Sequence, residues 1–590
     1  MKEYTIKYGE KEFRASEYQC RIFDNVEHGV GNMIISAAAG AAKSTTIINC
    51  INLIDENKKI LFIAFNKDIV ESIRKRVGER KNTKISTFHS LGYSILKENL
   101  HDNHEHEDNF INEFKYRNYI KNNIDNITCY KETKSLSKNR ILYINNIIDL
   151  VEYSRYYLAF TEKEIKRISD KYGLVLLRDE VDVCREVLKW GKENISQIDY
   201  TDMIWLPNVL NLLTKKYLFD WILIDEAQDT SIAEQNIIDK CFKRGARFIV
   251  VCDQFQQINV WCGSSEEAIN NFGKYPNTNL FTLPITYRCP KKVVDLAKNF
   301  SDNIVAADNA IDGEIKYGVS KYSPTSNDMV LCRNTAPLVD LHLQYIRVNK
   351  KSYVMGFDNI KEKYIQLINS TSAKIIDKNC ITKNGLFPKI YEGLLEQIDI
   401  VKRDFGLDDD DAIMHTSVYS MFDTIEGIRV VSEGLTTVDE LVDKINVIFS
   451  GTEKDAIQLS TVHKAKGLEA DNVFILYPSL MPSKYAKKDW EVKTEKNLMY
   501  VAYTRAKKSL NFIEEEKKTF GYSSSLFEPS NMKAQVEYMR KKLNHNETVA
   551  NINITLAQPK VLGQDDNEEK NTVTKRNKKT AASKFAVMLK

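Results

Sequence analysis

The 590-residue sequence lacks the marks of secreted and membrane-spanning proteins. It has no run of about 18 apolar residues, the length that a membrane-spanning helix needs. Its first fifteen residues carry no apolar segment of the kind that directs secretion. Its ten cysteines include no CxxC pair, which argues against a disulfide framework and against a zinc or iron–sulfur site. We therefore expect a cytoplasmic protein with free or buried thiols.

An excess of charge of one sign is also missing. Lys and Arg number 84 and Asp and Glu number 81, which leaves a net charge of +3. The whole-chain charge therefore gives no sign of nucleic-acid binding, and any basic surface must be local. Apolar residues at 43% and charged residues at 28% are typical of globular proteins. The length alone predicts about four domains.

Short, β-rich apolar runs are present instead, separated by helix-like or loop segments. They lie at 32–36, 61–65, 221–226, 247–253, 329–333 and 472–477. Such runs are typical of buried parallel strands. The sequence therefore predicts an α/β fold.

Two stretches have few strand signals. Between 101 and 195, Ile141, Ile144, Ile148 and Val151 recur at three- and four-residue spacing, as do Val181, Cys184 and Leu188, which predicts a helical insertion. The second stretch, 359–450, contains the helix-like segment TTVDELVDKINVIF.

Two polar segments are expected to be solvated. HDNHEHEDN at 101–109 contains three histidines, but its composition favours a loop over a metal site. Residues 545–590 are polar and charged and end in SKFAVMLK. We expect a flexible tail there, with a frayed end favoured over a docking peptide.

The segment AAAGAAKS, residues 37–44, has the spacing of a phosphate-binding P-loop. In such a loop, backbone N–H groups surround the phosphates, a lysine reaches the terminal phosphates and a Ser or Thr hydroxyl holds Mg²⁺. Gly40 is present, but alanine replaces the usual glycine at Ala37 and Ala42, and alanine disfavours positive φ angles. Alone, the segment also fits a small-residue helix start.

Two adjacent acids end the apolar run WILIDE. Asp225 and Glu226 stand where a doubly wound parallel sheet presents its ligand site. One carboxylate can orient Mg²⁺ and the next can activate the attacking water, as phosphoryl transfer requires. Together with the P-loop they predict a nucleoside triphosphate site, and helix capping by the two acids is the alternative.

The order of the motifs resembles that of superfamily 1 DNA helicases of the UvrD/Rep type. Gln19 in SEYQCRIF precedes the P-loop, as the adenine-reading glutamine of that family does. The segments AFNK and TFHSLGY resemble the helicase portion of F-box DNA helicases more than they resemble UvrD itself. The further segments, in order, are FIAFNK (62–67), STFHSLGY (86–93), IDYTDMI (198–204), LIDEAQDT (223–230), VVCDQFQQINVWCGS (250–264), TYRCP (286–290), STVHKAKGLEADNVFIL (460–476) and NLMYVAYTRAKKSL (497–510).

This resemblance implies two RecA-like P-loop motor domains, each a parallel sheet flanked by helices and interrupted by a mainly helical insertion. ATP would lie between the motors, with single-stranded DNA across them. The implied boundaries are 1–100 and 196–283 for the first motor, 101–195 for its insertion, 284–358 and 451–544 for the second motor, 359–450 for its insertion and 545–590 for the flexible tail.

For ATP, the resemblance implies that Lys43 contacts the terminal phosphates and that Ser44 and Asp225 hold Mg²⁺. Glu226 would be the general base, and Gln256 would sense the γ-phosphate. Arg288 and Arg505 would reach the γ-phosphate, where arginine side chains neutralise charge on the transferring group. Tyr287 would stack on adenine and Glu469 would contact the ribose. The full nucleotide-binding set would be Gln19, Ala39, Gly40, Ala41, Ala42, Lys43, Ser44, Thr45, Tyr287, Arg288, Glu469 and Arg505.

For single-stranded DNA, aromatic platforms and groups directed at the backbone give a grip that need not depend on sequence. Phe65 and Trp261 are the stacking candidates. The polar candidates are Asn66, Thr87, His89, Thr461 and His463. Core packing is the alternative for Phe65, Trp261 and His89, because an aromatic residue after an apolar strand is often buried.

Four positions depart from the family pattern: Ala42 and Cys252 replace glycines, Asn259 replaces a tyrosine and Cys262 replaces an arginine. A negative φ at Ala42 would cost little, whereas a positive φ would weaken nucleotide binding. Asn259 and Cys262 remove one ring and one cation from the DNA side of their motif. Because the side chains expected to act on ATP remain, we expect an active ATPase.

The resemblance implies an ATP-driven helicase that moves 3′ to 5′ on single-stranded DNA. It would unwind tailed or forked duplexes in replication, recombination or repair. A translocase that strips proteins from single-stranded DNA shares every motif. A third possibility is a helicase-like, DNA-sensing subunit of a partner nuclease, with residues 545–590 docking a protein partner. The oligomeric state stays open.

Overall fold

The computed structural model divides the chain into two compact units. Unit 1 comprises Met1–Gly313 and Lys493–Thr504, and unit 2 comprises Glu314–Val492 and Arg505–Lys590. The histidine-rich 101–109, the tail at 545–590, and Asn259, Trp261 and Cys262 lie outside the described residues. The residues that the structure describes are 2–8, 11–78, 80–99, 110–127, 140–172, 174, 176, 179–212, 215–258, 267–405, 407–413, 415–448, 455–484, 486, 488–514 and 532–543.

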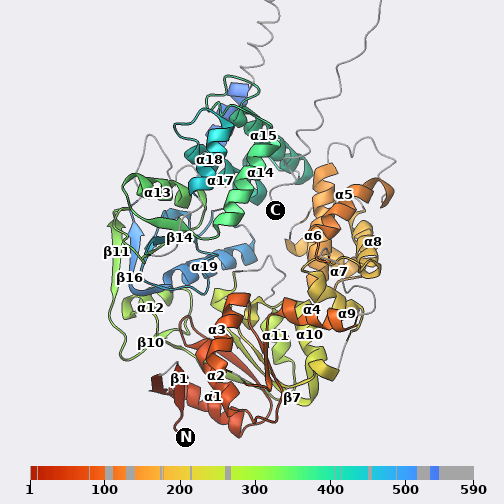
Figure 1. The fold of residues 1–590 in the computed structure, drawn as a ribbon, viewed down its shortest axis with the longest axis vertical. Coiled ribbons are helices and arrows are strands. Elements are labelled where there is room, and N and C mark those ends of the chain that lie inside the picture. Colours follow the sequence, from red (N-terminus) through yellow and green to blue (C-terminus); the bar gives the residue numbers. More distant parts are fainter. Residues whose placement is uncertain are drawn as a thin grey trace, which may run out of the picture. The chain divides into compact units, whose positions relative to one another are not determined.

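Unit 1 is built on a six-stranded sheet in the order β5-β4-β6-β7-β3-β8. Figure 1 labels β7 of this sheet and the neighbouring helices α1, α2, α3, α10 and α11. Every neighbouring pair is parallel, so the carboxyl ends of all six strands lie at one edge. At that edge β7 separates β3 from β6. The strands are β3 (Asn32–Ala37), β4 (Ile60–Ile63), β5 (Thr83–Ser86), β6 (Phe219–Ile224), β7 (Phe242–Cys252) and β8 (Thr278–Leu283).

Helices connect these parallel strands, as a parallel sheet requires. Two small strand pairs complete this part of unit 1: β1 (Thr5–Tyr8) with β2 (Lys11–Arg14), and β9 (Ile285–Thr286) with β10 (Val305–Ala306). The helices are α1 (Glu17–Glu27), α2 (Lys43–Leu53), α3 (Lys67–Val77), α4 (Phe88–Asn99), α10 (Ile232–Cys241), α11 (Glu267–Gly273) and α12 (Lys291–Ala297).

A helical group lies between β5 and β6 in the sequence, after α4. Its helices are α5 (Lys115–Ile127), α6 (Arg140–Tyr157), α7 (Glu162–Tyr172), α8 (Glu180–Glu193) and α9 (Asp202–Val209). Ile144 and Val151 of α6 and Val181, Cys184 and Leu188 of α8 lie in one buried cluster. The helices predicted from three- and four-residue spacing are therefore confirmed, and their apolar stripes face a common core.

Unit 2 contains a second parallel six-stranded sheet, in the order β11-β16-β15-β12-β14-β13. The strands are β11 (Glu314–Val319), β12 (Met329–Cys332), β13 (Ser352–Val354), β14 (Ile457–Thr461), β15 (Ala470–Ile475) and β16 (Ala506–Ile513). The helices are α13 (Ala336–Arg347), α14 (Phe357–Ser370), α15 (Leu386–Phe405), α16 (Asp409–Ile413), α17 (Thr416–Val431), α18 (Val438–Ile448) and α19 (Asp489–Tyr503), whose residues from Lys493 onward count with unit 1.

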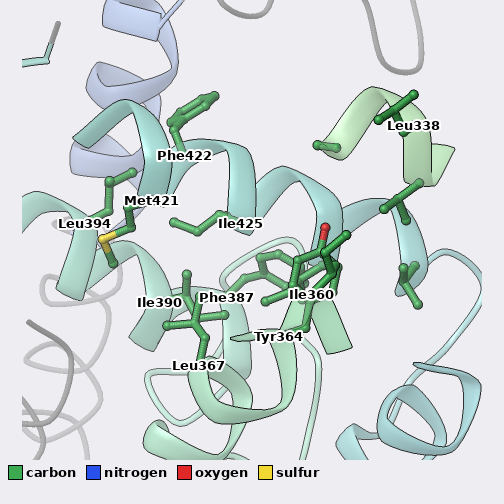
Figure 2. Close-up of a cluster of buried hydrophobic side chains, with 14 of the residues drawn as sticks. Leu338, Ile360, Tyr364, Leu367, Phe387, Ile390, Leu394, Met421, Phe422 and Ile425 are labelled. Carbon is green, nitrogen blue, oxygen red and sulfur yellow. The ribbon is translucent and has the colours of Figure 1, made fainter. Parts of the chain in front are cut away.

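One hydrophobic core joins this sheet to its helices. Buried side chains of α14, α15 and α17 form much of it (Figure 2). Val330 and Leu459 reach the same core from β12 and β14. The helix at 532–543 adds Met532 and Val536. The continuous core explains why residues far apart in the sequence form a single compact unit.

The predicted α/β class is confirmed, and the six predicted apolar runs are β3, β4, β6, β7, β12 and β15. The helix expected in TTVDELVDKINVIF is α18. The implied motor and insertion boundaries stay a prediction. No helix among the described residues combines the length and the apolar character needed to cross a bilayer.

Candidate active site

The loop between β3 and α2 has two residues with left-handed backbone. Gly40 has a φ of 72°, and a Cβ there would lie 2.6 Å from Arg288 Cβ and 2.7 Å from Thr286 Oγ1. Only glycine fits this position. Ala42, directly before α2, has φ 56° and ψ 37° and makes no side-chain cap. The left-handed conformation costs a non-glycine residue about 1–2 kcal/mol, so the alanine at this position is strained.

The N–H groups of this loop fall into two sets. In the first set, Ala38 N donates to Leu283 O at the end of β8 (2.9 Å), Ala39 N to the hydroxyl of Tyr500 (3.1 Å) and Ala41 N to Ala38 O (3.2 Å). The second set has no acceptor among the described residues and consists of the N–H groups of Gly40, Ala42, Lys43 and Ser44. Free amides at a helix N-terminus form an anion-binding concavity.

Lys43 places a buried ammonium in this concavity. Its Nζ forms an ion pair with Glu226 Oε1 at 3.1 Å, and no other group among the described residues accepts a hydrogen bond from it. Burial alone would lower the pKa of Lys43, but attraction to Glu226, Asp253 and Asp225 outweighs it and raises the pKa above the usual value. The side chain therefore stays charged and keeps its donors available.

Asp225 follows β6 and lies beside Ser44. Ser44 Oγ donates to Asp225 Oδ2 at 2.6 Å, and the other carboxylate oxygen accepts from Glu226 N at 3.0 Å. Burial, and then the neighbouring Glu226 charge, raise the pKa of Asp225. Neither acid caps a helix with its side chain: Glu226 makes no cap bond, and α10 is capped by Ser231. The capping alternative for the two acids is therefore wrong.

Asp253 is a buried carboxylate at the same edge that the sequence reasoning did not select. It follows β7, the strand between β3 and β6. Gln256 Nε2 donates to Asp253 Oδ2 at 2.6 Å, and Asp253 N donates to Gln228 Oε1 at 3.0 Å. Gln228 Nε2 in turn donates to Glu226 Oε2 at 2.5 Å. A continuous chain of hydrogen bonds thus joins Glu226 to Gln256.

Three further predicted ATP residues also lie in unit 1. The Gln19 amide donates to Thr46 Oγ1 of α2 (3.0 Å), while its oxygen accepts from Ser16 N in the capping box of α1. Tyr287 N donates to Gly40 O (2.9 Å), and the Tyr287 residue is 53% exposed. Arg288 Nη1 donates to Thr504 O at 3.3 Å. All three residues are therefore within unit 1 and tied to the P-loop, to α2 or to the end of α19.

The hydroxyl of Thr45, another predicted site residue, accepts a hydrogen bond from Arg76 of α3 at 2.8 Å. Glu469 and Arg505 belong to unit 2. Arg505 is buried and donates to Leu468 O at 3.2 Å, and Glu469 lies 3.5 Å from Lys507 Nζ.

The DNA candidates of unit 1 follow β4 and β5, at the same sheet edge as the P-loop. Phe65 is 49% exposed, so the core-packing alternative does not hold for it. Asn66 Oδ1 accepts from Ile69 N at the start of α3 (2.9 Å), and Thr87 Oγ1 accepts from Ser90 N (3.1 Å). His89 is partly buried, and burial lowers its pKa, which favours a neutral ring.

The DNA candidates of unit 2 lie at the end of β14. Thr461 is its last residue, and His463 follows. Burial, with a smaller effect from Arg333, lowers the pKa of His463 to about 3, so this imidazole is neutral near pH 7. Trp261 lies outside the described residues.

Helix α19 supplies residues that the sequence reasoning missed. Tyr500 is fully buried and receives the Ala39 N–H. Asn497 Nδ2 donates to Gln257 O (2.9 Å) and to Gln254 O (3.2 Å), beside Gln256. The signal was present, because both residues lie in NLMYVAYTRAKKSL, from which only Arg505 was selected.

Two protein-family models match this chain. The UvrD/REP helicase N-terminal domain matches residues 21–277, which include the P-loop and the acids after β6 and β7. The UvrD-like helicase C-terminal domain matches residues 457–513, and the two matches together cover more than half of the chain. The chain belongs to the UvrD/Rep helicase family. The resemblance inferred from the motif order is therefore confirmed.

Individual relatives of this UvrD/Rep family member are distant. It is 24% identical to the ATP-dependent DNA helicase Rep of Buchnera aphidicola subsp. Acyrthosiphon pisum, over 84% of this chain and 94% of that protein. It is 22% identical to a probable DNA helicase II homolog of Mycoplasma capricolum, over 81% of each chain. Identity to F-box DNA helicase 1 of Gallus gallus is 24% over 81% of this chain, which spans less than half of that relative. The identity is 24% both to Rep and to F-box DNA helicase 1, so it does not distinguish between the two groups.

Proposed function

We propose that this protein is an ATP-dependent DNA helicase that moves along single-stranded DNA and separates duplex strands in replication, recombination or repair. The observation that carries the proposal is the constellation around Lys43. The buried Lys43 ammonium pairs with Glu226 and lies near Asp225 and Asp253, beside four loop amides that have no acceptor among the described residues. Donors for phosphate oxygens and acceptors for a cation thus occur together, as phosphoryl transfer needs.

The residues present fit a hydrated Mg²⁺ ion. Ser44 Oγ and Asp225 Oδ2, 2.6 Å apart, are hard oxygen ligands of the kind that Mg²⁺ prefers. Three carboxylates against one ammonium leave excess negative charge in a buried place, which a divalent cation would neutralise. When bound, Mg²⁺ supplies charge neutralisation at the phosphates.

Residues of unit 1 would bind and orient ATP. Lys43 and the free amides would hold the phosphates, and Tyr287 would pack on adenine beside Gln19. Glu226 is partly exposed and held by Gln228, so it can accept a proton from the attacking water. Gln256, held by Asp253, would orient that water against the γ-phosphate.

Residues of both units would complete the ATP site. Arg288 and Arg505 would neutralise charge on the γ-phosphate, and Glu469 would contact the ribose. Supplying these groups from different parts of the chain would make hydrolysis depend on their correct placement.

Single-stranded DNA would be held at the carboxyl edges of the two sheets. Phe65 would stack on a base, and Asn66, Thr87, His89, Thr461 and His463 would meet the backbone. Neutral histidines suit this role, because they donate or accept hydrogen bonds without a fixed charge. We propose that the protein moves along this strand from 3′ to 5′.

The proposed location is the cytoplasm. All eight described cysteines are free and buried, which fits a reducing compartment.

Unwinding of 3′-tailed and 5′-tailed duplexes tests the proposal. We expect the wild type with ATP and Mg²⁺ to unwind the 3′-tailed duplex and Lys43→Ala to unwind neither. Because loss of a buried cation can also unfold the protein, Asp225→Asn is the second variant, and circular dichroism monitors the fold of both. Equal unwinding by the wild type and Lys43→Ala would show that the assigned ATP site is wrong. DNA-stimulated ATP hydrolysis without unwinding would favour a protein-stripping translocase.

A further inference from the structure

Strand β8, with the sequence TNLFTL, forms one edge of the sheet in unit 1. It pairs with β3 in unbroken register along its whole length. Ala38 N donates to Leu283 O, the last residue of β8, and backbone groups alternate sides along a strand. The odd-numbered residues of β8 therefore face β3, and the backbone groups of Thr278, Leu280 and Thr282 point to the outer edge.

This outer edge is open. No residue in the described part of the chain forms a hydrogen bond with the outward backbone groups of these three residues. Strand β10 comes alongside only beyond β8, where Val305 N donates to Pro284 O. Asn279 and Leu280 point to opposite faces of the sheet, and both are exposed, Leu280 at 78%. Neither face covers the edge at this point.

The other edge strands of the two six-stranded sheets carry features that prevent pairing with a foreign strand. Charged side chains, irregular pairing and very short length serve this purpose in natural sheets. β5 has four residues and includes Lys84, and β13 has only three residues. β11 contains Glu314 and Lys316, with a register irregularity after Lys316. β8 has six residues, with no charge, no proline and no irregularity.

The outward-facing residues of β8 complement a second copy of themselves. Thr278, Leu280 and Thr282 read the same from either end, so in an antiparallel pair of β8 strands Leu280 meets its own copy and Thr278 meets Thr282. Threonine pairs across strands are favourable, and like charges directly opposite are unfavourable. Because a two-fold axis places a central side chain against its own copy, a charge there would repel itself, and β8 has none.

We propose that β8 is an interface at which two copies of this chain pair, antiparallel, about a two-fold axis at Leu280. Each of the three outward residues would donate one backbone hydrogen bond and accept one, as in the hydrogen-bonded pairs of antiparallel strands. The exposed Leu280 side chains of the two copies would lie side by side on one face. Strand addition of this kind takes its affinity from main-chain bonds.

An extended peptide from another protein would also fit an open edge. A second β8 is favoured because it is uncharged, has the same length as the edge and has the complementary order of side chains. The proposal goes beyond the proposed function and does not depend on it, since no residue of β8 is assigned to ATP or DNA. One strand pair is smaller than the interface of a stable complex, so we expect a weak, reversible dimer.

Sedimentation velocity of the full chain tests the proposal at about 1 µM and about 100 µM, a range that covers weak dimers. We expect the wild type to shift from monomer toward dimer, and Leu280→Lys to stay monomeric at both concentrations. Ile381→Lys is the matched control, because Ile381 is 72% exposed but lies in unit 2 and outside any strand. It should dimerise as the wild type does. Thermal unfolding verifies that both variants are folded.

Amide hydrogen exchange locates the interface. The amides of Thr278, Leu280 and Thr282 have no acceptor among the described residues, so they should exchange rapidly in the monomer. In the wild type at the higher concentration, their exchange should slow in proportion to the fraction of monomer that remains. The amides of Asn279 and Phe281, which face β3, should not change. A wild-type dimer that leaves the three outward amides unchanged would contradict the proposal.

A mixture of Leu280→Lys and Leu280→Asp tests the position of the axis. Each variant alone should be monomeric, because the axis places like charges opposite each other. The mixture should contain more dimer than either variant alone, because opposite charges then meet across the axis. An absence of any gain in the mixture would show that Leu280 does not face its own copy.

A wild type that is monomeric at both concentrations would overturn the proposal, as would a Leu280→Lys protein that dimerises like the wild type. If the wild type stays monomeric but a hexapeptide of alternating threonine and valine slows exchange of the three outward amides, the edge is a peptide site and the proposal is wrong. Lys43→Ala should dimerise like the wild type, so failure of the ATP site and failure of this interface are distinguishable.

Discussion

At the residue scale, the backbone of Ala42 decides a question that the sequence left open. An alanine at this P-loop position costs little with a negative φ and is strained with a positive one. The observed φ is 56°, so the strained case applies. Single φ angles are not readable from sequence, because the same residue types fit both conformations.

We predict that Ala42→Gly raises the free energy of unfolding by about 1 kcal/mol and lowers the Michaelis constant for ATP, because glycine adopts this φ without strain. Ala41→Gly is the matched control. Its φ is not positive, so it should lower stability by about 0.4–1 kcal/mol through the greater freedom of the unfolded chain. Urea unfolding and steady-state kinetics measure both effects. Changes of the same sign in the two variants would contradict the assigned strain.

The charge of a buried aspartate can lower the stability of the fold while it serves the site. Asp225 is buried beside Glu226, and both burial and that neighbour raise its pKa. Asp220, at the other end of β6, is the reverse case: its pKa is lowered by hydrogen bonds from Lys243 and Lys59 N, which outweigh the opposing effect of burial. One aspartate near the start of β6 thus has a favourable charge, and the aspartate that directly follows the strand has a costly one.

We predict that Asp225→Asn raises the free energy of unfolding by about 0.5–2 kcal/mol while abolishing Mg²⁺-dependent ATP hydrolysis, as expected where a functional group is held against stability. Asp220→Asn should lower stability and keep hydrolysis. Thermal unfolding without nucleotide, together with an ATPase assay, measures both properties. A destabilised Asp225→Asn protein would show that this carboxylate serves the fold and not the site.

At the element scale, α10 is held by a capping box directly after the acids of β6. Ser231 Oγ accepts from Glu234 N, and Glu234 Oε2 accepts from Ser231 N at 2.7 Å. Burial raises the pKa of Glu234 from 4.5 to about 7. Since the folded protein binds this proton more tightly than the unfolded chain does, the stabilisation is present below about pH 4.5 and is lost as the pH rises to about 7.

We predict that Glu234→Gln flattens this pH dependence, because glutamine also serves in a capping box and does not ionise. The thermal midpoint of the variant should exceed that of the wild type by an amount that grows from pH 5 to pH 8. Thermal unfolding across that range provides the measurement. A constant difference between the two proteins would mean that Glu234 is not held protonated by burial.

Strands with continuous apolar runs, such as β4 and β6, were predictable, whereas β8 and β13 were not. β4 and β6 are buried on nearly every residue, which gives the sequence signal of central parallel strands. β8, TNLFTL, lies at the edge of its sheet and is largely exposed, and β13 has only three residues. Edge strands and very short strands bury too little apolar surface to produce a recognisable apolar run in the sequence.

At the scale of the whole molecule, the site depends on strand order as well as on motifs. Asp225 and Glu226 were found because two acids end one apolar run. Asp253 ends another run, but a single acid gave too weak a signal. Only the placement of β7 between β3 and β6 shows that Asp253 belongs with Lys43. The bond from Ala39 to Tyr500 joins residues 461 positions apart, which no local pattern predicts.

The small net charge of +3 can also be related to the function of the whole molecule. A uniformly basic surface would bind DNA through counterion release whatever the nucleotide state. Here the cation that matters for ATP is local, at Lys43 in the P-loop. This distribution suits a protein that must hold DNA and release it in each ATP cycle.

The central claim is that Lys43, Asp225 and Glu226 form an ATP-hydrolysing site that responds to DNA. The most direct test is the rate of ATP hydrolysis by the wild type and Lys43→Ala, with Mg²⁺, in the presence and absence of single-stranded DNA. We predict hydrolysis by the wild type that single-stranded DNA stimulates, and none by the variant. No hydrolysis by the wild type in either condition, or equal rates for the two proteins, would contradict it.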